Sequence, residues 1–140
     1  MAADGKIEAL RAVSLFSELG QRDLEQVAQL ADTVDLPAGH VLMREGENGT
    51  QAFVMASGEA RVEHGGRQLA TLGPGSVLGE MALLAEGPRV ATATLTKPSR
   101  LFVLAHREFH SLMETQPSVR DCVLNEVARR LRELEPEKAP

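Results

Sequence analysis

The stretch GPGSVLGEMALLAEGPRVATATL, from Gly73 to Leu95, holds the most specific pattern in this chain. It opens with Gly-Pro-Gly, which is typical of the end of a strand. Gly79 would let the backbone approach a bulky group closely. The segment Glu80–Ala85 favours a short helical turn on intrinsic propensity, and the free N–H groups at the start of such a turn suit a phosphate. The stretch therefore predicts an anion-binding loop.

Two charged side chains in this stretch indicate which kind of anion would bind. Arg89 follows the turn, and its planar guanidinium can bind two phosphate oxygens at once, which a lysine cannot. Glu80 suits the start of a helical turn, but it would repel a phosphate unless it accepts a hydrogen bond from a hydroxyl of the same ligand. A ligand that carries both a phosphate and a sugar hydroxyl satisfies both residues.

The segment Leu78–Thr92 resembles the phosphate-binding cassette of cyclic nucleotide-binding domains. The family pattern is roughly Phe-Gly-Glu-Hyd-Ala-Leu-Hyd, where Hyd is apolar, followed after a spacer by Pro-Arg-Ala-Ala-Thr. This chain has Leu-Gly-Glu-Met-Ala-Leu-Leu and then Pro-Arg-Val-Ala-Thr, at the spacing typical of the family. The resemblance extends from about Leu15 to Leu134, and the chain is identified as a stand-alone, bacterial type of member.

The resemblance implies a set of ligand-binding residues in the cassette, namely Gly79, Glu80, Met81, Ala82, Arg89, Val90 and Ala91. In the family's arrangement, Arg89 would bind the phosphate, Glu80 a ribose hydroxyl, and the backbone N–H at Ala82 the phosphate. Val90 stands where the family usually has Ala, Ser or Thr. It lacks the hydroxyl that is associated with a contact to the guanine amino group or the phosphate. The resemblance therefore implies cAMP in preference to cGMP.

Two further groups of residues could contact the base. Four apolar residues could line a base pocket, although ordinary core packing explains each of them equally well: Val62, Leu72, Val77 and Leu78. In the family the last helix caps the base and moves when ligand binds, and its candidates here are Arg129, Arg130, Leu131 and Leu134. We assign Arg130 and Leu134 to the pocket. The apolar stripe of that helix could equally pack on the barrel or pair with the same helix of a second chain, as a homodimer.

The hydrophobic periodicity predicts helices, then strands, then helices. Helical spacing covers residues 6–13 and 21–32, and it returns from residue 106 to residue 134, where Pro117 interrupts it and Ser118 is a candidate cap. Between them lie short segments broken by glycine. We expect strands at 40–44, 51–56, 59–63, 67–72, 89–95 and 100–104, with a turn at 45–50 and a tight hairpin at His64-Gly65-Gly66.

This element order predicts an α+β fold, because short strands at near-regular spacing favour a barrel or sandwich over a parallel sheet. The resemblance to cyclic nucleotide-binding domains specifies this fold further, as an antiparallel β-roll or jelly-roll barrel with N-terminal helices and C-terminal lid helices. We divide the chain into a helical lead-in at 1–14, a cyclic nucleotide-binding domain at 15–134 and a polar tail at 135–140.

Composition narrows the function further. The 140 residues fit one domain, and 43% hydrophobic residues with four Phe, no Trp and no Tyr predict an aliphatic core that offers little base stacking. A net charge of −5 without a basic run argues against a nucleic-acid partner. Cys122 alone cannot form an internal disulfide. With no apolar run near 18 residues and no signal-peptide core, we expect a cytoplasmic protein without a membrane partner.

Other functions receive less support from the residues. The stretch GPGSVLGE lacks the Gly-Lys-Ser/Thr ending of an ATP-binding P-loop, no nucleophile–base pattern stands out, and we expect no enzyme and no cofactor. His106 and His110 have a spacing that two metal ligands could use, but Glu108 does not fit the metalloprotease pattern, and we expect no metal site. A DNA-binding regulator would need a helix-turn-helix after the long helix, and six residues follow Leu134.

The output of such a module must therefore lie in a separate effector protein or in a fused domain. One alternative stays open: a nucleotide-independent protein-interaction domain that keeps a degenerate form of the fold. Val90 and the lack of base-stacking aromatic residues favour that alternative, whereas the intact Gly-Glu and Pro-Arg pairs favour nucleotide binding.

Overall fold

The structure of the protein is a computed structural model, and it describes residues 2–135. The α-helices are α1 (Ala2–Leu10), α2 (Gln21–Leu30), α3 (His106–Thr115) and α4 (Pro117–Leu134), and two 3₁₀ helices are η1 (Ser14–Phe16) and η2 (Glu80–Leu83). The strands are β1 (Asp32–Leu36), β2 (Val41–Met43), β3 (Asn48–Gly49), β4 (Gln51–Ser57), β5 (Ala60–His64), β6 (Arg67–Leu72), β7 (Val77–Leu78), β8 (Gly87–Pro88), β9 (Thr92–Leu95) and β10 (Ser99–Ala105).

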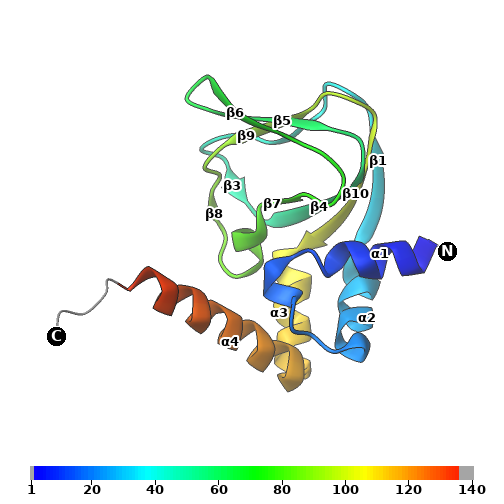
Figure 1. The fold of residues 1–140 in the computed structure, drawn as a ribbon, viewed down its shortest axis with the longest axis vertical. Coiled ribbons are helices and arrows are strands. Elements are labelled where there is room, and N and C mark those ends of the chain that lie inside the picture. The colour runs from blue at the N-terminus through cyan, green and yellow to red at the C-terminus, as the bar shows by residue number, and fades with distance from the viewer. Residues whose placement is uncertain (1, 136–140) are drawn as a thin grey trace.

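The strands form an antiparallel β-roll with all helices at one end (Figure 1). One four-stranded sheet has the order β1-β10-β4-β7, a second has the order β2-β9-β5-β6, and β3 pairs with β8. Every pairing is antiparallel. The β5–β6 hairpin turns at Gly65 and Gly66, both with positive φ, as the sequence predicts. The predicted fold class, an antiparallel β-roll with flanking helices, is confirmed.

Strands β4 and β10 are buried on both faces, which explains their nearly continuous apolar sequences AFVMA and LFVLA. Side chains alternate along a strand, so successive residues face opposite sides. Phe53, Met55 and Leu101 face the interior of the roll, in a cluster with Ala93 and Leu95. The alternate residues belong to a second cluster between this sheet and the helices: Ala52, Val54, Phe102 and Leu104.

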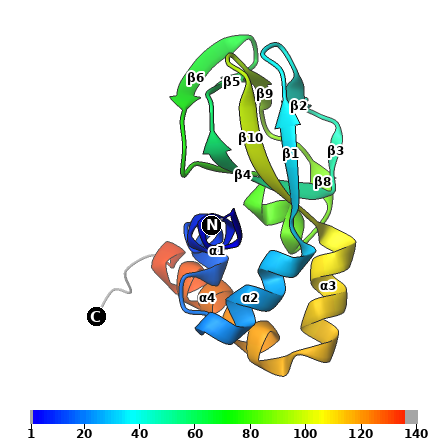
Figure 2. The same cartoon turned by 90° about the vertical axis from the view of Figure 1, so that its right-hand side faces the viewer.

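The helical layer packs beneath the roll through that second cluster (Figure 2). The apolar face predicted for the second helix is present in α2, where Leu24, Val27 and Ala28 are buried. Phe16 of η1 and Phe109 of α3 meet with ring centroids 5.3 Å apart. The stripe of α4 divides: Val119 and Val123 are fully buried in the cluster, whereas large apolar residues further along the helix are exposed.

The structure corrects several predicted boundaries. The first helix ends at Leu10, and 3₁₀ helix η1 follows it. Strand β1 begins at Asp32, where the sequence predicts the end of a helix, and the predicted turn at 45–50 contains β3. The strand predicted at 89–95 begins only at Thr92. Ser118 is not a cap, because Pro117 is the first residue of α4 and Gln116 precedes it as N-cap.

Within the described residues, no helix combines the length and the apolar character needed to span a membrane. Of the predicted polar tail, residues 136–140 lie outside the part of the chain that the structure describes.

Candidate functional site

Arg89 is held in place by its main chain and by its side chain. Its N–H donates to Glu47 O and its C=O accepts from Gly46 N, each at 2.8 Å, because the 45–50 loop runs alongside the cassette and β3 pairs with β8. Its guanidinium Nη2 donates to Gln51 O at 2.8 Å, and its Cζ lies 5.7 Å from the centroid of the Phe53 ring. The guanidinium is thus oriented before any ligand arrives.

Two glycines make room for this side chain. A Cβ built on Gly49 would come within 2.5 Å of Arg89 Nε, and one built on Gly79 would collide with Arg89 Nη1 and lie 3.0 Å from Gln51 O. Gly79 also has a φ of +72°, in the left-handed region that favours glycine. Partial burial lowers the pKa of the Arg89 guanidinium, which nevertheless stays charged at neutral pH. The close backbone approach predicted for Gly79 is therefore made toward Arg89.

Glu80 opens η2 and accepts hydrogen bonds from two separate parts of the helical layer. Leu15 N donates to Oε2 at 3.2 Å, and the Ser14 hydroxyl lies 3.3 and 3.4 Å from the two carboxylate oxygens. Arg130 Nη2 on α4 donates to Oε1 at 2.9 Å. The carboxylate is therefore the point where the cassette, η1 and α4 meet.

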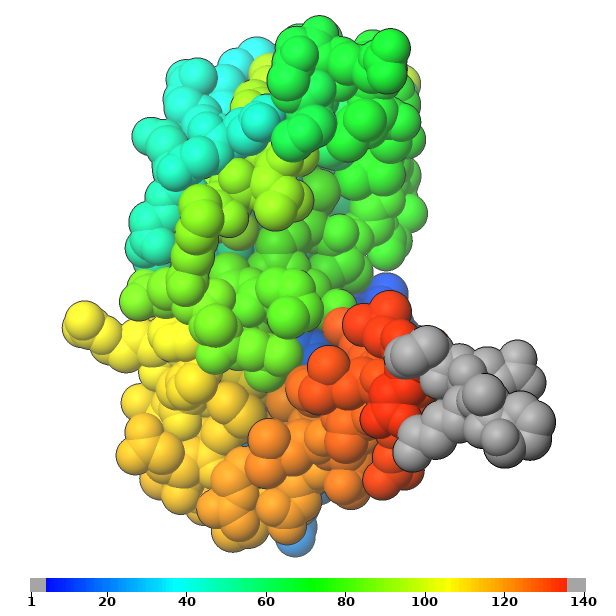
Figure 3. Space-filling view, turned by 90° about the vertical axis from the view of Figure 1, so that its left-hand side faces the viewer, coloured from blue at the N-terminus to red at the C-terminus, as the bar shows by residue number. Residues whose placement is uncertain are grey.

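Arg130 is itself held by a buried carboxylate on its own helix. Its Nε lies 3.4 Å from Glu126 Oε2, and Arg129 Nη2 binds the same oxygen at 2.6 Å. Hydrogen bonding to Arg129, and then the charges of Arg129 and Arg130, hold the pKa of Glu126 below its usual range. Figure 3 shows the second half of α4, in orange and red, lying below the green surface of the cassette.

A cavity of about 460 Å³ opens beside η2, within the size range of small-molecule sites. Glu80 and Arg89 both line it, together with Gly79, Ala82 and the cassette turn. Two exposed apolar residues line the wall of this cavity: Met81 is 60% exposed and Val90 is 78% exposed. An acidic and a basic group at one cavity can bind a ligand that offers both a hydroxyl and an anion.

The structure brings most of the predicted cassette residues together. Six of them line the cavity: Gly79, Glu80, Met81, Ala82, Arg89 and Val90. Ala91 is buried in the interior of the roll. The N–H of Ala82, predicted to face the phosphate, donates to Gly79 O at 3.0 Å.

The residues assigned to a base pocket are dispersed, and none of them lines this cavity. Val62, Leu72 and Leu78 pack in the interior of the roll, whereas Val77 packs against the helix-facing cluster. Arg130 reaches the cassette through Glu80, while Leu134 is 79% exposed near the end of α4. Their role at a base stays a prediction.

Sequence reasoning missed several residues of the site. Ser14 and Leu15 contact Glu80 from about 65 positions away, and no local pattern predicts that contact. Met43 lines the cavity from β2, and Gln51 orients Arg89 through a backbone oxygen that any residue type would provide. The pair Asn48-Gly49 predicts a turn, but a turn signal does not indicate that Gly49 contacts the side chain of Arg89.

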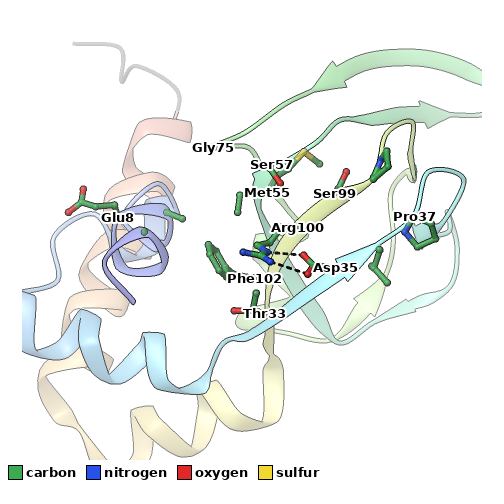
Figure 4. A pocket seen from close by; sticks show the side chains of 15 residues that line it. Glu8, Thr33, Asp35, Pro37, Met55, Ser57, Gly75, Ser99, Arg100 and Phe102 are labelled. Carbon is green, nitrogen blue, oxygen red and sulfur yellow. Dashed lines mark hydrogen bonds and ion pairs between the residues drawn. The ribbon is translucent and has the colours of Figure 1, made fainter. Parts of the chain in front are cut away.

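A larger cavity of about 1090 Å³ lies between α1 and the sheet of β1, β10 and β4 (Figure 4). None of its lining residues belongs to the cassette. The charged groups at its wall include Asp35 and Arg100, which already bind each other at 2.8 and 3.1 Å, and the Ser99 hydroxyl donates to Lys97 O. Asp35 and Arg100 thus satisfy each other, and the remaining charge at the wall is the carboxylate of Glu8, which would repel an anion. The cassette cavity with Arg89 is therefore the stronger candidate for an anionic ligand.

Comparison with known families decides the assignment of the chain. Residues 33–116, more than half of the sequence, match the family model described as "Cyclic nucleotide-binding domain". The chain belongs to this family. The match covers the roll, the whole cassette and α3. The matched region therefore contains all the residues that line the cassette cavity.

Individual relatives of this cyclic nucleotide-binding domain are longer proteins. The chain is 32% identical over 131 residues to the cyclic AMP receptor protein of Thermus thermophilus, covering 90% of this chain and 61% of that protein. It spans 58% to 61% of the length of the first curated relatives that it matches.

Solved structures agree with the fold. The N-terminal domain of a transcriptional regulator from Streptomyces coelicolor superimposes with a TM-score of 0.81 at 30% identity, covering 91% of this chain and 94% of that one. The regulatory domain of Toxoplasma gondii PKA, determined with cAMP, superimposes with a TM-score of 0.73 at 30% identity, covering 79% of this chain and 44% of that one.

Proposed function

We propose that this cyclic nucleotide-binding domain is a regulatory module that binds cAMP in preference to cGMP and responds by moving α4. The observation that carries the proposal is the pairing of Glu80 and Arg89 at one cavity. The proposal needs no metal or cofactor besides the nucleotide, and it describes a binding module rather than an enzyme.

The cyclic phosphate would bind at Arg89. The guanidinium is fixed by Gln51 O and by the Phe53 ring, so little side-chain entropy is lost when it binds the ligand. The ribose hydroxyl would donate to Glu80, which resolves the conflict between a carboxylate and a nearby phosphate. The related domain of Toxoplasma gondii PKA was determined with cAMP, which supports this class of ligand.

The preference for adenine rests on Val90. Its side chain is exposed at the cavity and has no hydroxyl with which to bind the guanine amino group. On the other side of the base, Arg130 and the exposed Leu134 are the residues that α4 could bring over the ligand. We therefore propose that α4 contributes to the base site only after it has moved.

Competition for Glu80 supplies a reason for α4 to move. A carboxylate offers about four acceptor positions, and donors from Ser14, Leu15 and Arg130 already occupy most of them. Leu15 is part of the buried core, whereas Arg130 is a long side chain on a half-buried helix. The Ser14 hydroxyl is a neutral donor at 3.3 and 3.4 Å, and its displacement would leave the contact of α4 in place. The proposal is that the ribose hydroxyl takes the position of Arg130 at Oε1, so that α4 loses its contact with the cassette.

The effector is proposed to be a partner protein or a fused domain. Relatives named as transcriptional regulators and as potassium channels extend well beyond the region that this chain matches. The exposed side of α4 offers an apolar surface for a second copy of the chain, formed by Leu124, Leu131 and Leu134. A homodimer through α4 is part of this proposal.

The test is a calorimetric titration of protein freed of bound nucleotide, first with cAMP and then with cGMP. We expect saturable binding of one cAMP per chain and weaker binding of cGMP. Equal affinities would remove Val90 as a determinant of specificity. The absence of saturable binding at millimolar concentrations of either nucleotide would contradict the proposal.

One observation favours the alternative of a nucleotide-independent interaction domain. Met81 and Val90 expose apolar surface at the mouth of the cavity, where a protein partner could cover them. The fixed guanidinium of Arg89 favours an anionic ligand instead. Silence of folded protein in both titrations would leave the interaction domain as the function that fits.

A further inference from the structure

The end of η2 is held by histidines from another helix. A short helix leaves carbonyl groups at its C-terminal end without intrahelical partners. Ala82 O of η2 lies 2.8 Å from Nδ1 of His106, and the O of Leu84, the C-cap residue of η2, lies 3.2 Å from Nε2 of His110. Both histidines belong to the first turns of α3. The carbonyls at the end of the cassette helix are therefore satisfied by α3 rather than by the cassette itself.

The chemistry of these contacts fixes where the hydrogens lie. A carbonyl oxygen can only accept, so Nδ1 of His106 and Nε2 of His110 must each carry a hydrogen. The two residues are four apart on one helix face, and their ring centroids lie 4.0 Å apart. Each ring limits the rotation of the other, which makes the pair a fixed two-pronged donor.

The same part of α3 is anchored in the helical core. Phe109 lies between the two histidines in the sequence and is fully buried. It belongs to one apolar cluster with Val119 and Val123 of α4. The histidines thus connect the cassette carbonyls to α3, and Phe109 connects α3 to the start of α4.

We infer that His106 and His110 are positioning residues that couple the cassette to α3 and α4. This inference rests on the proposed function for its consequence, because the movement to be transmitted is the one that nucleotide binding would cause. The histidine pair joins the cassette backbone to the start of α3. The cassette has further contacts with the helical layer, through Glu80 to Ser14, Leu15 and Arg130 and through Leu83, which is buried in the same cluster as Phe109. Without the histidine pair, the packing of Leu83 against the cluster of Phe109 would still join the cassette to α3, so we expect a reduced transfer of movement to α3.

The experiment compares variants by hydrogen exchange and mass spectrometry, with and without cAMP, and by calorimetry. The double variant His106→Leu/His110→Leu removes both donors. The variant His106→Asn/His110→Gln keeps them, because the Asn amide nitrogen replaces Nδ1 and the Gln amide nitrogen replaces Nε2. The exchanged variant His106→Gln/His110→Asn has the same composition but places both donors wrongly, so it serves as the matched control.

We expect the two variants without correctly placed donors, His106→Leu/His110→Leu (Leu/Leu) and His106→Gln/His110→Asn (Gln/Asn), to bind cAMP with an affinity within about threefold of the wild type. Both should lose at least half of the change in hydrogen exchange that cAMP causes in α3 and α4 of the wild type. The Asn/Gln variant should respond like the wild type. The inference would be overturned if Gln/Asn and Leu/Leu both kept the full cAMP-induced change in exchange. It would also be overturned if Asn/Gln, which keeps both donors, failed to show that change. If Leu/Leu does not fold, the Asn/Gln and Gln/Asn pair decides alone.

A readout without ligand separates this inference from the proposed function. Loss of the donors should speed exchange in residues 79–85 of the unliganded protein at least threefold, and Asn/Gln should prevent that increase. Unchanged exchange there would overturn the positioning role whether or not cAMP binds. A wild type that binds no cAMP, with faster exchange in Gln/Asn, would overturn the proposed function and leave the contact between cassette and α3 standing.

Discussion

Arg130 Nη2 of α4 donates a hydrogen bond of 2.9 Å to Glu80 Oε1 of the cassette, across 50 residues of sequence. Glu126 holds Arg130 from the other side, on the buried face of the helix. One side chain therefore connects the proposed ribose site to the helix that the proposed mechanism moves. If this contact has to break when ligand binds, its strength opposes binding.

Replacement of Arg130 by alanine is accordingly expected to raise the affinity for cAMP. A partly exposed ion pair contributes about 1 kcal/mol, so its removal should tighten binding by about fivefold. Calorimetric titration measures the change. Arg129→Ala is the matched control, because Arg129 binds the same Glu126 but has no contact with Glu80. Weaker binding by Arg130→Ala would contradict the competition and show that Arg130 supports the site instead, by orienting Glu80 or by contacting the base after α4 has moved.

A comparison of Gly79→Ala with Gly75→Ala should distinguish two effects: the cost of backbone strain to folding stability, and the loss of cAMP affinity when Arg89 is displaced. Gly79 and Gly75 both have positive φ, and alanine at either position should cost about 1–2 kcal/mol of folding free energy. Of these two glycines, Gly79 is the one at which a Cβ would meet Arg89, whereas at Gly75 nothing lies within 4 Å. We expect Gly79→Ala to weaken cAMP binding by about tenfold or more, since about 1.4 kcal/mol of a charge-assisted contact is lost. Denaturant unfolding and titration of both variants test this, and equal affinities would contradict it.

The lowered pKa of Glu126 predicts that the free energy of unfolding depends on pH. Its pKa is lowered in the folded protein by Arg129 and Arg130, so the unfolded chain binds the proton more readily than the folded one. The stabilisation is present above the ordinary pKa of a glutamate and is lost as the pH falls through the folded pKa. Asp35 and Glu59 have lowered pKa values as well and contribute over the same range.

Glu126→Gln isolates this contribution. Denaturant unfolding between pH 7 and pH 3 should show a smaller loss of stability for the variant than for the wild type. Glu133→Gln is the control, because Glu133 also binds Arg129 but lies on the exposed side of α4. Parallel pH profiles for the wild type and Glu126→Gln would remove Glu126 from the acid sensitivity of the fold.

The apolar surface of α4 predicts self-association. Leu124, Val127, Leu131 and Leu134 occupy positions that repeat at the three- and four-residue spacing of a coiled-coil seam. Leu131→Glu, at a residue 60% exposed, should abolish a dimer and leave the monomer folded, because the side chain is outside the core. Sedimentation velocity of both proteins checks this. A wild type that stays monomeric at about 100 μM would contradict the homodimer.

Local signals in the sequence predicted most of the fold. The hairpin at Gly65 and Gly66 and the apolar face of α2 depend on neighbouring residues, and both are confirmed. Strand β1 was missed because DTVDL alternates weakly and follows a helix without a turn residue between them. The position of β3 was missed because it pairs with β8, about 40 residues later, and such a distant partner leaves no local signal.

For the site, the cassette motif predicted Glu80 and Arg89 at one cavity, and the structure places them there. The motif could not predict what else binds Glu80. Ser14 and Arg130 reach it through tertiary packing, and neither spacing nor composition records that contact. The stripe of α4 was predicted as one face, yet it divides. Val119 and Val123 are buried in the core and Val127 packs partly against it, whereas Leu131 and Leu134 extend past it.

The most direct test of nucleotide binding is a cAMP titration of the wild type beside Arg89→Ala and Arg100→Ala. Arg100 is an equally charged residue whose ion pair with Asp35 lies outside the cassette. We predict one site per chain in the wild type, unchanged affinity in Arg100→Ala, and a loss of about thirtyfold or more in Arg89→Ala, which corresponds to about 2 kcal/mol. Equal affinity of the two arginine variants, or a wild type that does not bind, would contradict the assignment of the phosphate to Arg89.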